Sequence, residues 1–287
     1  MSGKRGHVLQ LLREALVDAP PTGRLAVAFS GGVDSTLLLA LAREAVGDRV
    51  LAVTAHSESL AARELEACQR LAAQLEVPLI LVRTRELDRP DYRANSSDRC
   101  YHCKTELFER LGDELVEREG IAAVAYGATA DDLGDHRPGM RAASEHQILK
   151  PLADAELGKD EIRALSRELG LETWDKPAQP CLASRIPYGQ AVSAEKLARI
   201  DGAEALLKDE GFRELRVRHH SQPGGDMARI ELPLDELPRL LEADRRQRVV
   251  AGLRALGFHY VSLDLEGFRS GRLNEVLTER RLPLALS

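Results

Sequence analysis

Short apolar runs alternate with longer amphipathic segments through the first half of the chain. The apolar runs have the length of strands, and the segments between them have the length and composition of helices. The expected strands are 24–29, 49–55, 77–83 and 121–128, and the expected helices are 36–46, 60–75, 105–119 and 159–170. Apolar strands separated by helices are typical of a parallel sheet covered on both faces. The pattern therefore predicts a doubly wound α/β domain with a mostly parallel sheet.

The pattern changes in the last third of the chain. The stretch 174–189 carries three prolines, which predicts extended backbone and turns. Beyond it the pattern predicts a helix at 193–210, strands at 213–219 and 227–232, a helix at 235–256 and a strand at 258–265. A chain of 287 residues exceeds the size at which one core usually keeps growing. We expect an α/β domain over 1–184 and a smaller C-terminal α+β domain over 185–287.

The amino-acid composition limits the kinds of binding partner expected for this protein. The formal net charge is -6 and the pI is about 5.8, so there is no overall electrostatic footprint for nucleic acid. No stretch approaches the ~18 apolar residues of a membrane span, and we expect a cytoplasmic protein with no membrane partner. Cytoplasmic thiols stay reduced, so the four cysteines favour metal, redox or catalytic roles over disulfides.

A glycine pair follows the first expected strand, at the point where doubly wound sheets bind ligands. Two adjacent glycines let the backbone approach an anion closely, and the helix behind them offers unpaired N–H groups and the positive end of its dipole. The loop lacks the lysine of GxxxxGK[ST] and the spacing of GxGxxG. The expected phosphate-binding residues are Ser30, Gly31, Gly32, Asp34, Ser35 and Thr36.

The segment SGGVDS resembles the PP-loop of the ATP pyrophosphatase superfamily, which cleaves ATP between the α and β phosphates and transfers AMP to an acceptor oxygen. The resemblance implies that Asp34 acts in catalysis near the pyrophosphate and its Mg²⁺. YGATADD resembles the second nucleotide-contacting strand end of that superfamily. The resemblance implies that Ala55 and Ser57 contact the adenine, and that Gly127 and Thr129 contact the ribose and the α-phosphate. It also implies that Asp131 or Asp132 helps to hold the metal. Arg137 is a candidate partner for a phosphate or a carboxylate.

Several further segments together resemble the LarE family across nearly the whole chain. They are HRPG, KPAQPCLASRIPYG, LRVRHH, ARIEL and YVSLDLEGFRSGRLNE. Members of this family are sulfur transferases that make the organic part of the nickel-pincer nucleotide cofactor of lactate racemase. The resemblance implies adenylylation of a carboxylate of pyridinium-3,5-biscarboxylic acid mononucleotide, followed by conversion to a thiocarboxylate. It also implies a homo-oligomer, dimer-based or hexameric.

The resemblance places the sulfur-bearing cysteine of the family at Cys181. In one branch this residue gives up its own sulfur and becomes dehydroalanine, and that branch lacks the C-x-x-C formed here by Cys100 and Cys103. This sequence is similar to the other branch, in which three cysteines hold a 4Fe-4S cluster that carries an extra sulfide. Three thiolates leave one iron without a protein ligand, where sulfide can bind. We therefore expect Cys100, Cys103 and Cys181 to share one cluster, and the source of the sulfide has no signature in the sequence.

Two other interpretations of the C-x-x-C remain open at this point. A structural zinc of Cys₃His type would add His102, which lies inside the motif. A C-x-x-C that opens a helix also suits thioredoxin-like redox chemistry, although the context of that fold is missing. Cys68 lies at core spacing in its helix and is expected to be a buried small hydrophobe.

The segment RELRVRHH predicts a site for the acceptor. A period of two sends Arg216, Arg218 and His220 to one face of the strand, and forked guanidiniums match phosphate geometry. The alternative is that these side chains lie on a solvated face and form ion pairs with Glu214 and Glu231. The expected substrate contacts are Arg137, Ser184, Arg185, Arg216, Arg218 and Arg269.

Three rival functions share parts of this pattern. A tRNA thiolase of the same superfamily would need a basic face and an RNA-binding module, which the charge does not indicate. An amidotransferase-type synthetase would need an ammonia source, and the sequence shows no glutaminase segment. A sensor that binds nucleotide and an iron-sulfur cluster would consume no acceptor.

Overall fold

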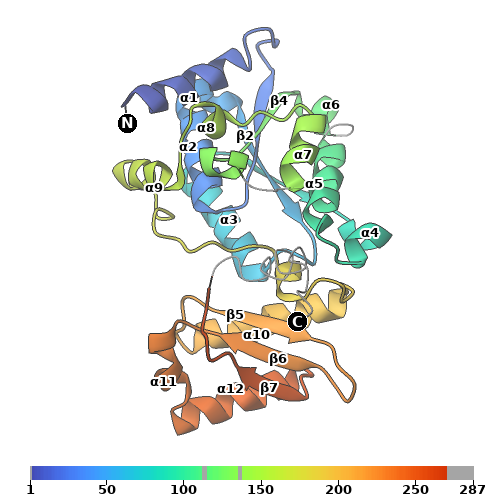
Figure 1. Ribbon diagram of the computed structural model, residues 1–287. Helices are drawn as coiled ribbons and strands as arrows, with labels where there is room; N and C mark the ends of the chain where they lie inside the picture. The colour runs from blue at the N-terminus through green and yellow to red at the C-terminus, as the bar shows by residue number, and fades with distance from the viewer. Residues whose placement is uncertain (1, 112–114, 135–137, 270–287) are drawn as a thin grey trace, which may run out of the picture. The chain divides into compact units, whose positions relative to one another are not determined.

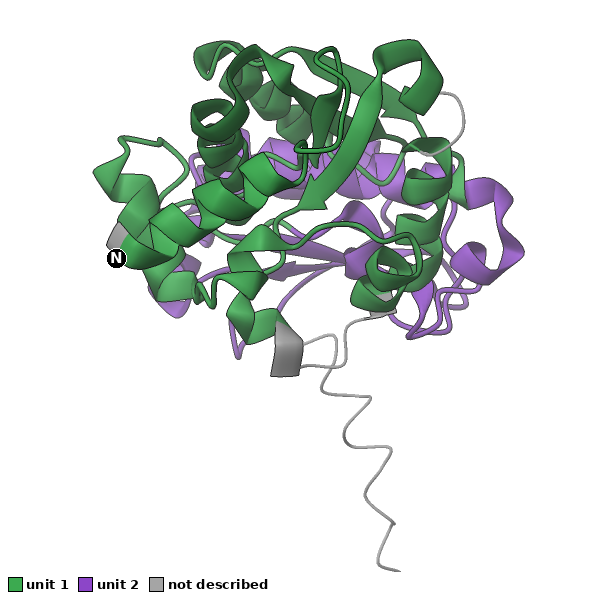
Figure 2. Ribbon diagram, turned by 90° about the horizontal axis from the view of Figure 1, so that it is seen from above, with its two compact units in different colours: residues 1–86, 100–179 green, residues 87–99, 180–287 purple. Residues whose placement is uncertain are grey.

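The computed structural model describes residues 2–111, 115–134 and 138–269, which form two compact units (Figures 1 and 2). Unit 1 comprises residues 1–86 and 100–179, and unit 2 comprises residues 87–99 and 180–287. The chain therefore passes between the units after residues 86, 99 and 179. A short internal segment, 87–99, belongs with the C-terminal part of the chain rather than with its neighbours in sequence.

Unit 1 is built on a four-stranded parallel sheet in the order β3-β2-β1-β4. The strands are β1 (Arg24–Ala28), β2 (Val50–His56), β3 (Leu79–Arg83) and β4 (Ile121–Tyr126). The sheet and its helices confirm the α/β class expected from the alternation of apolar runs and helices.

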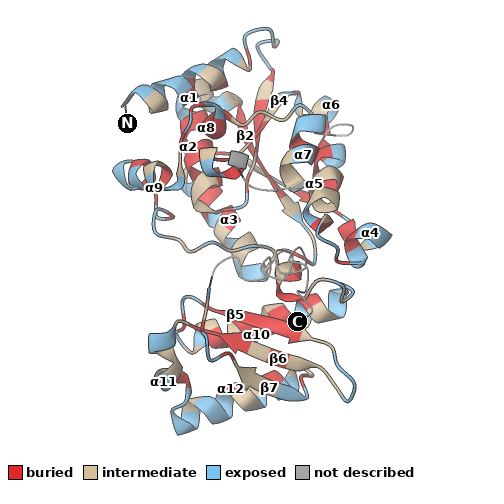
Figure 3. Cartoon of the chain, viewed as in Figure 1, coloured by how far each residue is buried: buried red, intermediate tan, exposed pale blue. Residues whose placement is uncertain are grey.

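Helices cover both faces of this sheet (Figures 1 and 3). Leu25 and Val27 of β1 pack in one buried core, and Ala26 between them packs in another. The first core includes side chains from α1 (Ser2–Glu14), α2 (Val33–Val46), α3 (Ala62–Gln74) and α9 (Lys159–Glu168), and the second includes side chains from α5 (Arg99–Arg110) and α7 (Pro138–Glu145). Alternate residues of one strand thus face two dry cores, which explains its continuous apolar run.

The strand order creates a topological switch point in the sheet. From β1 the chain continues to β2 and β3 on one side, and then returns to form β4 on the other side of β1. The carboxyl ends of β1 and β4 therefore flank a topological switch point, where open α/β sheets bind their ligands.

Unit 2 has a three-stranded mixed sheet in the order β5-β6-β7. Strands β5 (Arg216–His220) and β6 (Met227–Glu231) are antiparallel, and β7 (Tyr260–Leu263) runs parallel to β6. Leu207 of α10 (Ala194–Asp209) and Leu253 of α12 (Ala243–Ala255) are buried in one core with Val217 and Ile230 of the sheet. This confirms the small α+β element expected at the C-terminal end.

The expected helix at 235–256 is interrupted. The segment 235–256 contains η6 (Leu234–Glu236), α11 (Leu237–Leu240) and α12, because Pro238 starts a new helix and Glu242 is extended ahead of α12. The segment 105–119 contains the end of α5 and the short α6 (Val116–Glu119). Further short helices include α4 (Pro90–Arg93), α8 (Pro151–Asp154) and the single turn η5 (Leu182–Arg185). No helix within the described ranges is both long and apolar enough to cross a membrane.

Truncation of Leu253 should destabilise unit 2. Its side chain has 0% exposure, so Leu253→Ala should lower the free energy of unfolding by about 2–5 kcal/mol. Leu265, which is 82% exposed, is the matched control, and Leu265→Ala should change stability by less than about 0.5 kcal/mol. Urea unfolding of both variants measures the difference, and equal midpoints would contradict the assignment of this core.

Candidate functional site

The phosphate-binding loop lies between β1 and α2. Gly31 has a φ of 65°, in the left-handed region that favours glycine. A Cβ at that position would also lie 3.0 Å from the sulfur of Cys68. Gly32 is the N-cap of α2 and makes no side-chain cap, so the first amides of the helix have no intrahelical acceptor and no capping side chain. Gly31 is required by the local geometry, and the loop presents backbone donors.

Buried oxygen atoms around this loop indicate a ligand. Within the described residues, Asp34 Oδ1, Thr36 Oγ1 and Thr129 Oγ1 are buried without a hydrogen-bond partner. Buried polar atoms in native structures are nearly always satisfied, so three of them in the segments that flank the switch point need an explanation. A bound nucleotide with its metal ion would supply the missing partners.

The end of β4 lies directly against the start of α2. A Cβ on Gly127 would lie 3.0 Å from the backbone nitrogen of Ser35, so only glycine allows this approach. Two residues further on, the buried Thr129 donates its backbone N–H to Asp132 Oδ2 at 2.8 Å. The structure thus brings the two expected nucleotide-contacting segments together at the switch point.

Lys159 is a residue that sequence reasoning missed. It is the first residue of α9, its Nζ forms an ion pair with Asp34 Oδ2, and its backbone N–H donates to Asp131 Oδ2 at 2.6 Å. A cation is unfavourable at a helix N-terminus because of the helix dipole. A lysine in that position was the available signal, and the carboxylates of the loop explain why it is tolerated.

Lys176 was also missed. Its Nζ donates to the carbonyl oxygen of Gly31 at 3.0 Å and to Glu64 Oε2 at 2.7 Å. The lysine therefore fixes the left-handed glycine from outside the loop. The stretch 174–189 was expected to form extended backbone and turns, with no role assigned to this lysine.

The residues expected at the adenine lie at the end of β2 and just after it. Ala55 is half-buried near the end of that strand. Ser57 accepts from the backbone N–H of Ser59 at 3.2 Å and hydrogen-bonds Glu86, so its hydroxyl belongs to the local loop structure. Their contact with adenine stays a prediction.

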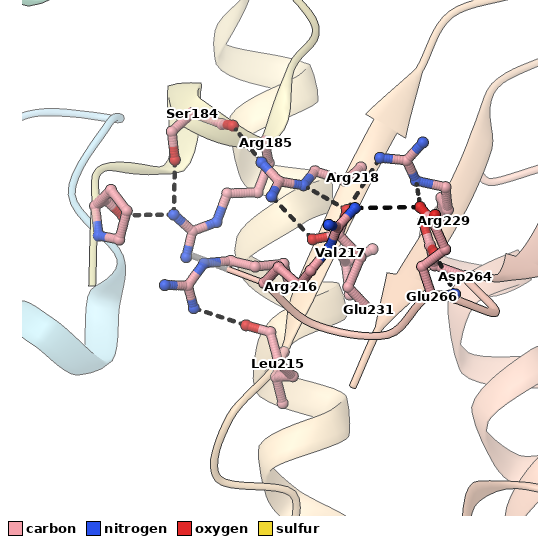
Figure 4. Close-up of polar contacts among 12 residues, drawn as sticks. Ser184, Arg185, Leu215, Arg216, Val217, Arg218, Arg229, Glu231, Asp264 and Glu266 are labelled. Carbon is pink, nitrogen blue, oxygen red and sulfur yellow. Dashed lines mark hydrogen bonds and ion pairs between the residues drawn. The ribbon is translucent and has the colours of Figure 1, made fainter. Parts of the chain in front are cut away.

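The turn η5, just after Cys181, is held by a buried arginine in unit 2 (Figure 4). Arg185 pairs with both carboxylate oxygens of Glu204, at 2.8 and 3.0 Å. It also donates to the carbonyl oxygens of Pro180 at 2.6 Å and of Cys181 at 3.2 Å. The hydroxyl of Ser184 donates to the same Cys181 carbonyl at 2.7 Å. Arg185 and Ser184, expected at the substrate, therefore fix the backbone of the cysteine.

The two arginines of β5 differ in their surroundings. Arg218 forms a bidentate ion pair with Glu231, with hydrogen bonds of 3.0 and 2.8 Å, and donates to the Ser184 carbonyl oxygen at 2.8 Å (Figure 4). Arg216 donates to the Leu215 carbonyl oxygen at 2.7 Å and lies 5.0 Å from the centre of the Phe268 ring. Burial, and next the positive charge of Arg185, lower the pKa of Arg216 to about 10. An anion beside Arg216 would be stabilised by this excess of positive charge.

Two further substrate residues were expected, Arg137 and Arg269. Arg269 is exposed and contacts Glu266 at 3.3 Å. Arg137 lies outside the described residues.

All four cysteines are reduced thiols. Cys100 and Cys103 lie three positions apart near the start of α5, so their side chains share one face of that helix. They belong to unit 1, whereas Cys181 belongs to unit 2. No group of three or more His, Cys, Asp or Glu side chains in the described ranges is assembled to hold a metal ion. The shared cluster site therefore stays a prediction.

Cys68 is a core residue. Its side chain has 0% exposure, and burial raises the pKa of its thiol to about 11. The raised pKa excludes it from thiolate chemistry near neutral pH. This agrees with the role expected from its spacing.

The fold and the loop together define a protein of the PP-loop class, and comparison with known proteins agrees. Residues 6–134 match the family model described as a PP-loop domain. The pyridinium-3,5-bisthiocarboxylic acid mononucleotide synthase of Lactiplantibacillus plantarum is 40% identical over 260 residues, which cover 90% of this chain and 92% of that protein. The chain belongs to the family of this synthase, the LarE family.

Two other relatives show how much of the chain the sequence similarity covers. An uncharacterised protein of Synechocystis is 43% identical over 89% of this chain and 94% of its own length. The glutamine-hydrolysing GMP synthase of Brucella melitensis is 30% identical over 72% of this chain, but that match covers only 45% of the synthase. The near full-length likeness to the first two relatives thus extends well beyond the PP-loop.

Replacement of Lys159 should weaken nucleotide binding. Lys159→Met removes the cation that neutralises Asp34, and the carboxylate would then repel the phosphates of ATP. We expect the Kd for ATP to rise about tenfold, measured by calorimetry. The control is Lys150→Met, because the pair of that lysine with Asp154 lies at α8. An unchanged Kd in Lys159→Met would contradict this role.

The half-buried His220 should make stability depend on pH. Burial, and next the charge of Arg229, lower its pKa from 6.5 to about 4, so the folded protein holds the ring neutral. Unfolding lets the ring take up a proton below pH 6.5, so this contribution is complete above pH 6.5 and is lost as the pH falls towards 4. Urea unfolding at pH 7 and pH 5 should show that the free energy of unfolding falls less between these two pH values for His220→Gln than for the unchanged protein. Equal losses would exclude His220 as the source.

Proposed function

We propose that this protein is an ATP-dependent sulfur transferase that activates a carboxylate of pyridinium-3,5-biscarboxylic acid mononucleotide and converts it to a thiocarboxylate. The observation that carries the proposal is the 40% identity, over 90% of the chain, to a synthase named for the corresponding bisthiocarboxylic product. The PP-loop domain supplies the ATP-binding element. The product would enter the biosynthesis of a nickel-pincer nucleotide.

Adenylylation explains the need for ATP. Hydroxide is a poor leaving group from a carboxylate, and AMP is a good one. The uncapped amides at the start of α2 and the cation of Lys159 would stabilise the pyrophosphate that leaves. Asp34 would hold Mg²⁺ through its buried Oδ1, since this ion prefers oxygen ligands. When bound, the ion would neutralise charge on the phosphates.

The arginine cluster of unit 2 suits the phosphate of the mononucleotide. Arg216 is the strongest candidate because its surroundings disfavour its own charge, and a phosphate would relieve this. Arg218 and Arg185 would add positive potential from positions fixed by Glu231 and Glu204. Arg269 is proposed as an outer contact.

The sulfur would be carried by the three cysteines other than the buried Cys68. The donor set fits a 4Fe-4S cluster, because Cys100, Cys103 and Cys181 are reduced thiols and the first two share a helix face. A cluster bound by three thiolates would supply an open iron for exogenous sulfide. The chain itself contributes the fixed backbone of Cys181, next to the arginines proposed for the substrate. We also propose self-association of the chain, as the family resemblance implies.

A reconstitution experiment tests this function. The protein is reconstituted anaerobically with iron and sulfide, and pyrophosphate release is measured with ATP and the pyridinium dicarboxylate nucleotide. We expect iron binding, release that depends on this acceptor, and a thiocarboxylate product. Cys181→Ala should lose iron and product but retain acceptor-dependent pyrophosphate release, whereas Cys68→Ala should retain all three.

Mass analysis of the protein separates the outcomes. A loss of about 34 Da, the mass of H₂S, at Cys181 in each turnover would indicate that the cysteine sacrifices its own sulfur. ATP consumption without the acceptor would favour a sensor. Dependence on tRNA would favour a thiolase, and either result would overturn the proposed substrate.

A further inference from the structure

The lysine that contacts the phosphate-binding loop belongs to a segment that two helices of unit 1 hold in place. This segment, residues 171–176, follows α9 and lies in unit 1. Arg163 of α9 donates to the carbonyl oxygen of Lys176 at 3.0 Å, and Arg70 of α3 forms an ion pair with Glu172. The side chain of Lys176 therefore extends from a fixed backbone.

The ammonium group of Lys176 joins the loop to α3. Its Nζ donates to the carbonyl oxygen of Gly31 at 3.0 Å and to Glu64 Oε2 at 2.7 Å, and Glu64 lies in the first turn of α3. The side chains of the lysine and the glutamate are only 20% and 15% exposed, so salt screens this pair little. Hydrogen bonds that carry a charge are shorter and stronger than neutral ones. The Gly31 carbonyl is thus held by a partner outside the loop.

The carbonyl of Gly31 and the N–H of Gly32 belong to one peptide unit. None of the peptide bonds in the described residues is cis, so this unit is trans and close to planar. In a trans unit the C=O and the N–H point in opposite directions. A hydrogen bond that holds the C=O towards Lys176 therefore holds the N–H of Gly32 towards the other side of the loop.

The N–H of Gly32 is available to a ligand. It donates to no acceptor in the part of the chain that the structure describes. A Cβ on Gly32 would meet only Ser30 Oγ, at 3.6 Å, so no side chain crowds this residue. In the same described ranges, Thr36 Oγ1 at the start of α2 is buried without a partner. An unused amide beside an unsatisfied hydroxyl, at the positive end of a helix, suits an anion.

We propose that Lys176 is a positioning residue for the pyrophosphate part of ATP. It holds the Gly31–Gly32 peptide so that the N–H of Gly32 donates to the β- or γ-phosphate. The loop itself contains no lysine, and a segment more than a hundred positions away supplies the cation that orients it. Lys159 acts differently, because it pairs with Asp34 directly. The proposal rests on the proposed function only in that ATP is the nucleotide.

The test measures the binding of inorganic pyrophosphate and of AMP by calorimetry. Lys176→Met removes the donor to Gly31 but keeps an unbranched side chain. We expect the Kd for pyrophosphate to rise about tenfold, because the displaced amide no longer donates to a charged ligand. The Kd for AMP should stay unchanged, since the α-phosphate is expected at Gly127 and Thr129. Equal rises for both ligands would indicate general damage to the loop and would overturn the proposal.

A double variant separates position from charge. Lys176→Met alone leaves the carboxylate of Glu64 beside the loop, where it would repel a phosphate. Lys176→Met combined with Glu64→Gln removes one charge of each sign. If the lysine acts by positioning, the double variant keeps the raised Kd for pyrophosphate, whereas a Kd restored to that of the unchanged protein would reveal a charge effect and defeat the proposal. Lys176→Arg keeps a charged donor and should retain most of the affinity.

Arg70→Gln is the matched control, because it removes an ion pair of the same segment that does not involve the loop. Its Kd for pyrophosphate should equal that of the unchanged protein. If Lys176→Met does not fold, as judged by circular dichroism, Glu64→Gln is compared with Arg70→Gln, and a raised Kd is expected only in Glu64→Gln. An unchanged Kd in Lys176→Met, equal values in Glu64→Gln and Arg70→Gln, or no binding of pyrophosphate to the unchanged protein would each count against the role.

The result can be separated from the test of function, because binding is measured without the acceptor. If Lys176→Met loses pyrophosphate affinity as expected but reconstitution yields no thiocarboxylate, the positioning role stands and the proposed function fails. If reconstitution succeeds and Lys176→Met binds pyrophosphate normally, the function stands and the positioning role fails.

Discussion

The buried ion pair between Arg185 and Glu204 is the interaction on which unit 2 depends. The two side chains are 2% and 5% exposed, and Glu204 also accepts from the backbone N–H of Val217 at 3.1 Å. One carboxylate thus joins helix α10, strand β5 and the turn after Cys181. Charges without water are costly unless every polar atom is satisfied, so this pair tolerates little rearrangement. If the turn were mobile, the thiol of Cys181 and the arginines beside it would not keep constant positions relative to one another.

Under the proposed function, the two units would use different chemistry for the same kind of ligand. Unit 1 offers phosphates the backbone amides of α2, the hydroxyls of the loop and a lysine balanced by Asp34. Such a site suits a flexible triphosphate that must lose two of its groups. Unit 2 offers arginines held by carboxylates, which suits an anion that has to stay in one orientation. The division is consistent with one nucleotide that is consumed and another that is modified.

The first sheet could be predicted because each of its strands is a short apolar run bounded by helices of clear length. The segment 87–99 could not be assigned to unit 2, since its association depends on hydrogen bonds between residues as far apart as Asn95 and Gln190. The loop around Gly31 was predictable from two adjacent glycines. The partner of Arg185 was not predicted, since Glu204 lies 19 positions away, whereas Glu231, 13 positions from Arg218, had been named as an alternative partner for the arginine face of this strand. Local patterns carry no information about the pairing of Arg185 with Glu204, whereas for Lys159 the one local signal was a cation at the start of a helix.

The position of Cys68 has a consequence for how the protein tolerates oxygen. Its sulfur lies where a Cβ on Gly31 would come within 3.0 Å, and its pKa of about 11 leaves roughly one thiolate in ten thousand at pH 7. Oxidants attack thiolates that they can reach, and this one is neither ionised nor accessible. Air would therefore damage the cysteines near the surface first. A sample that has lost them would still bind adenine nucleotide at an intact loop.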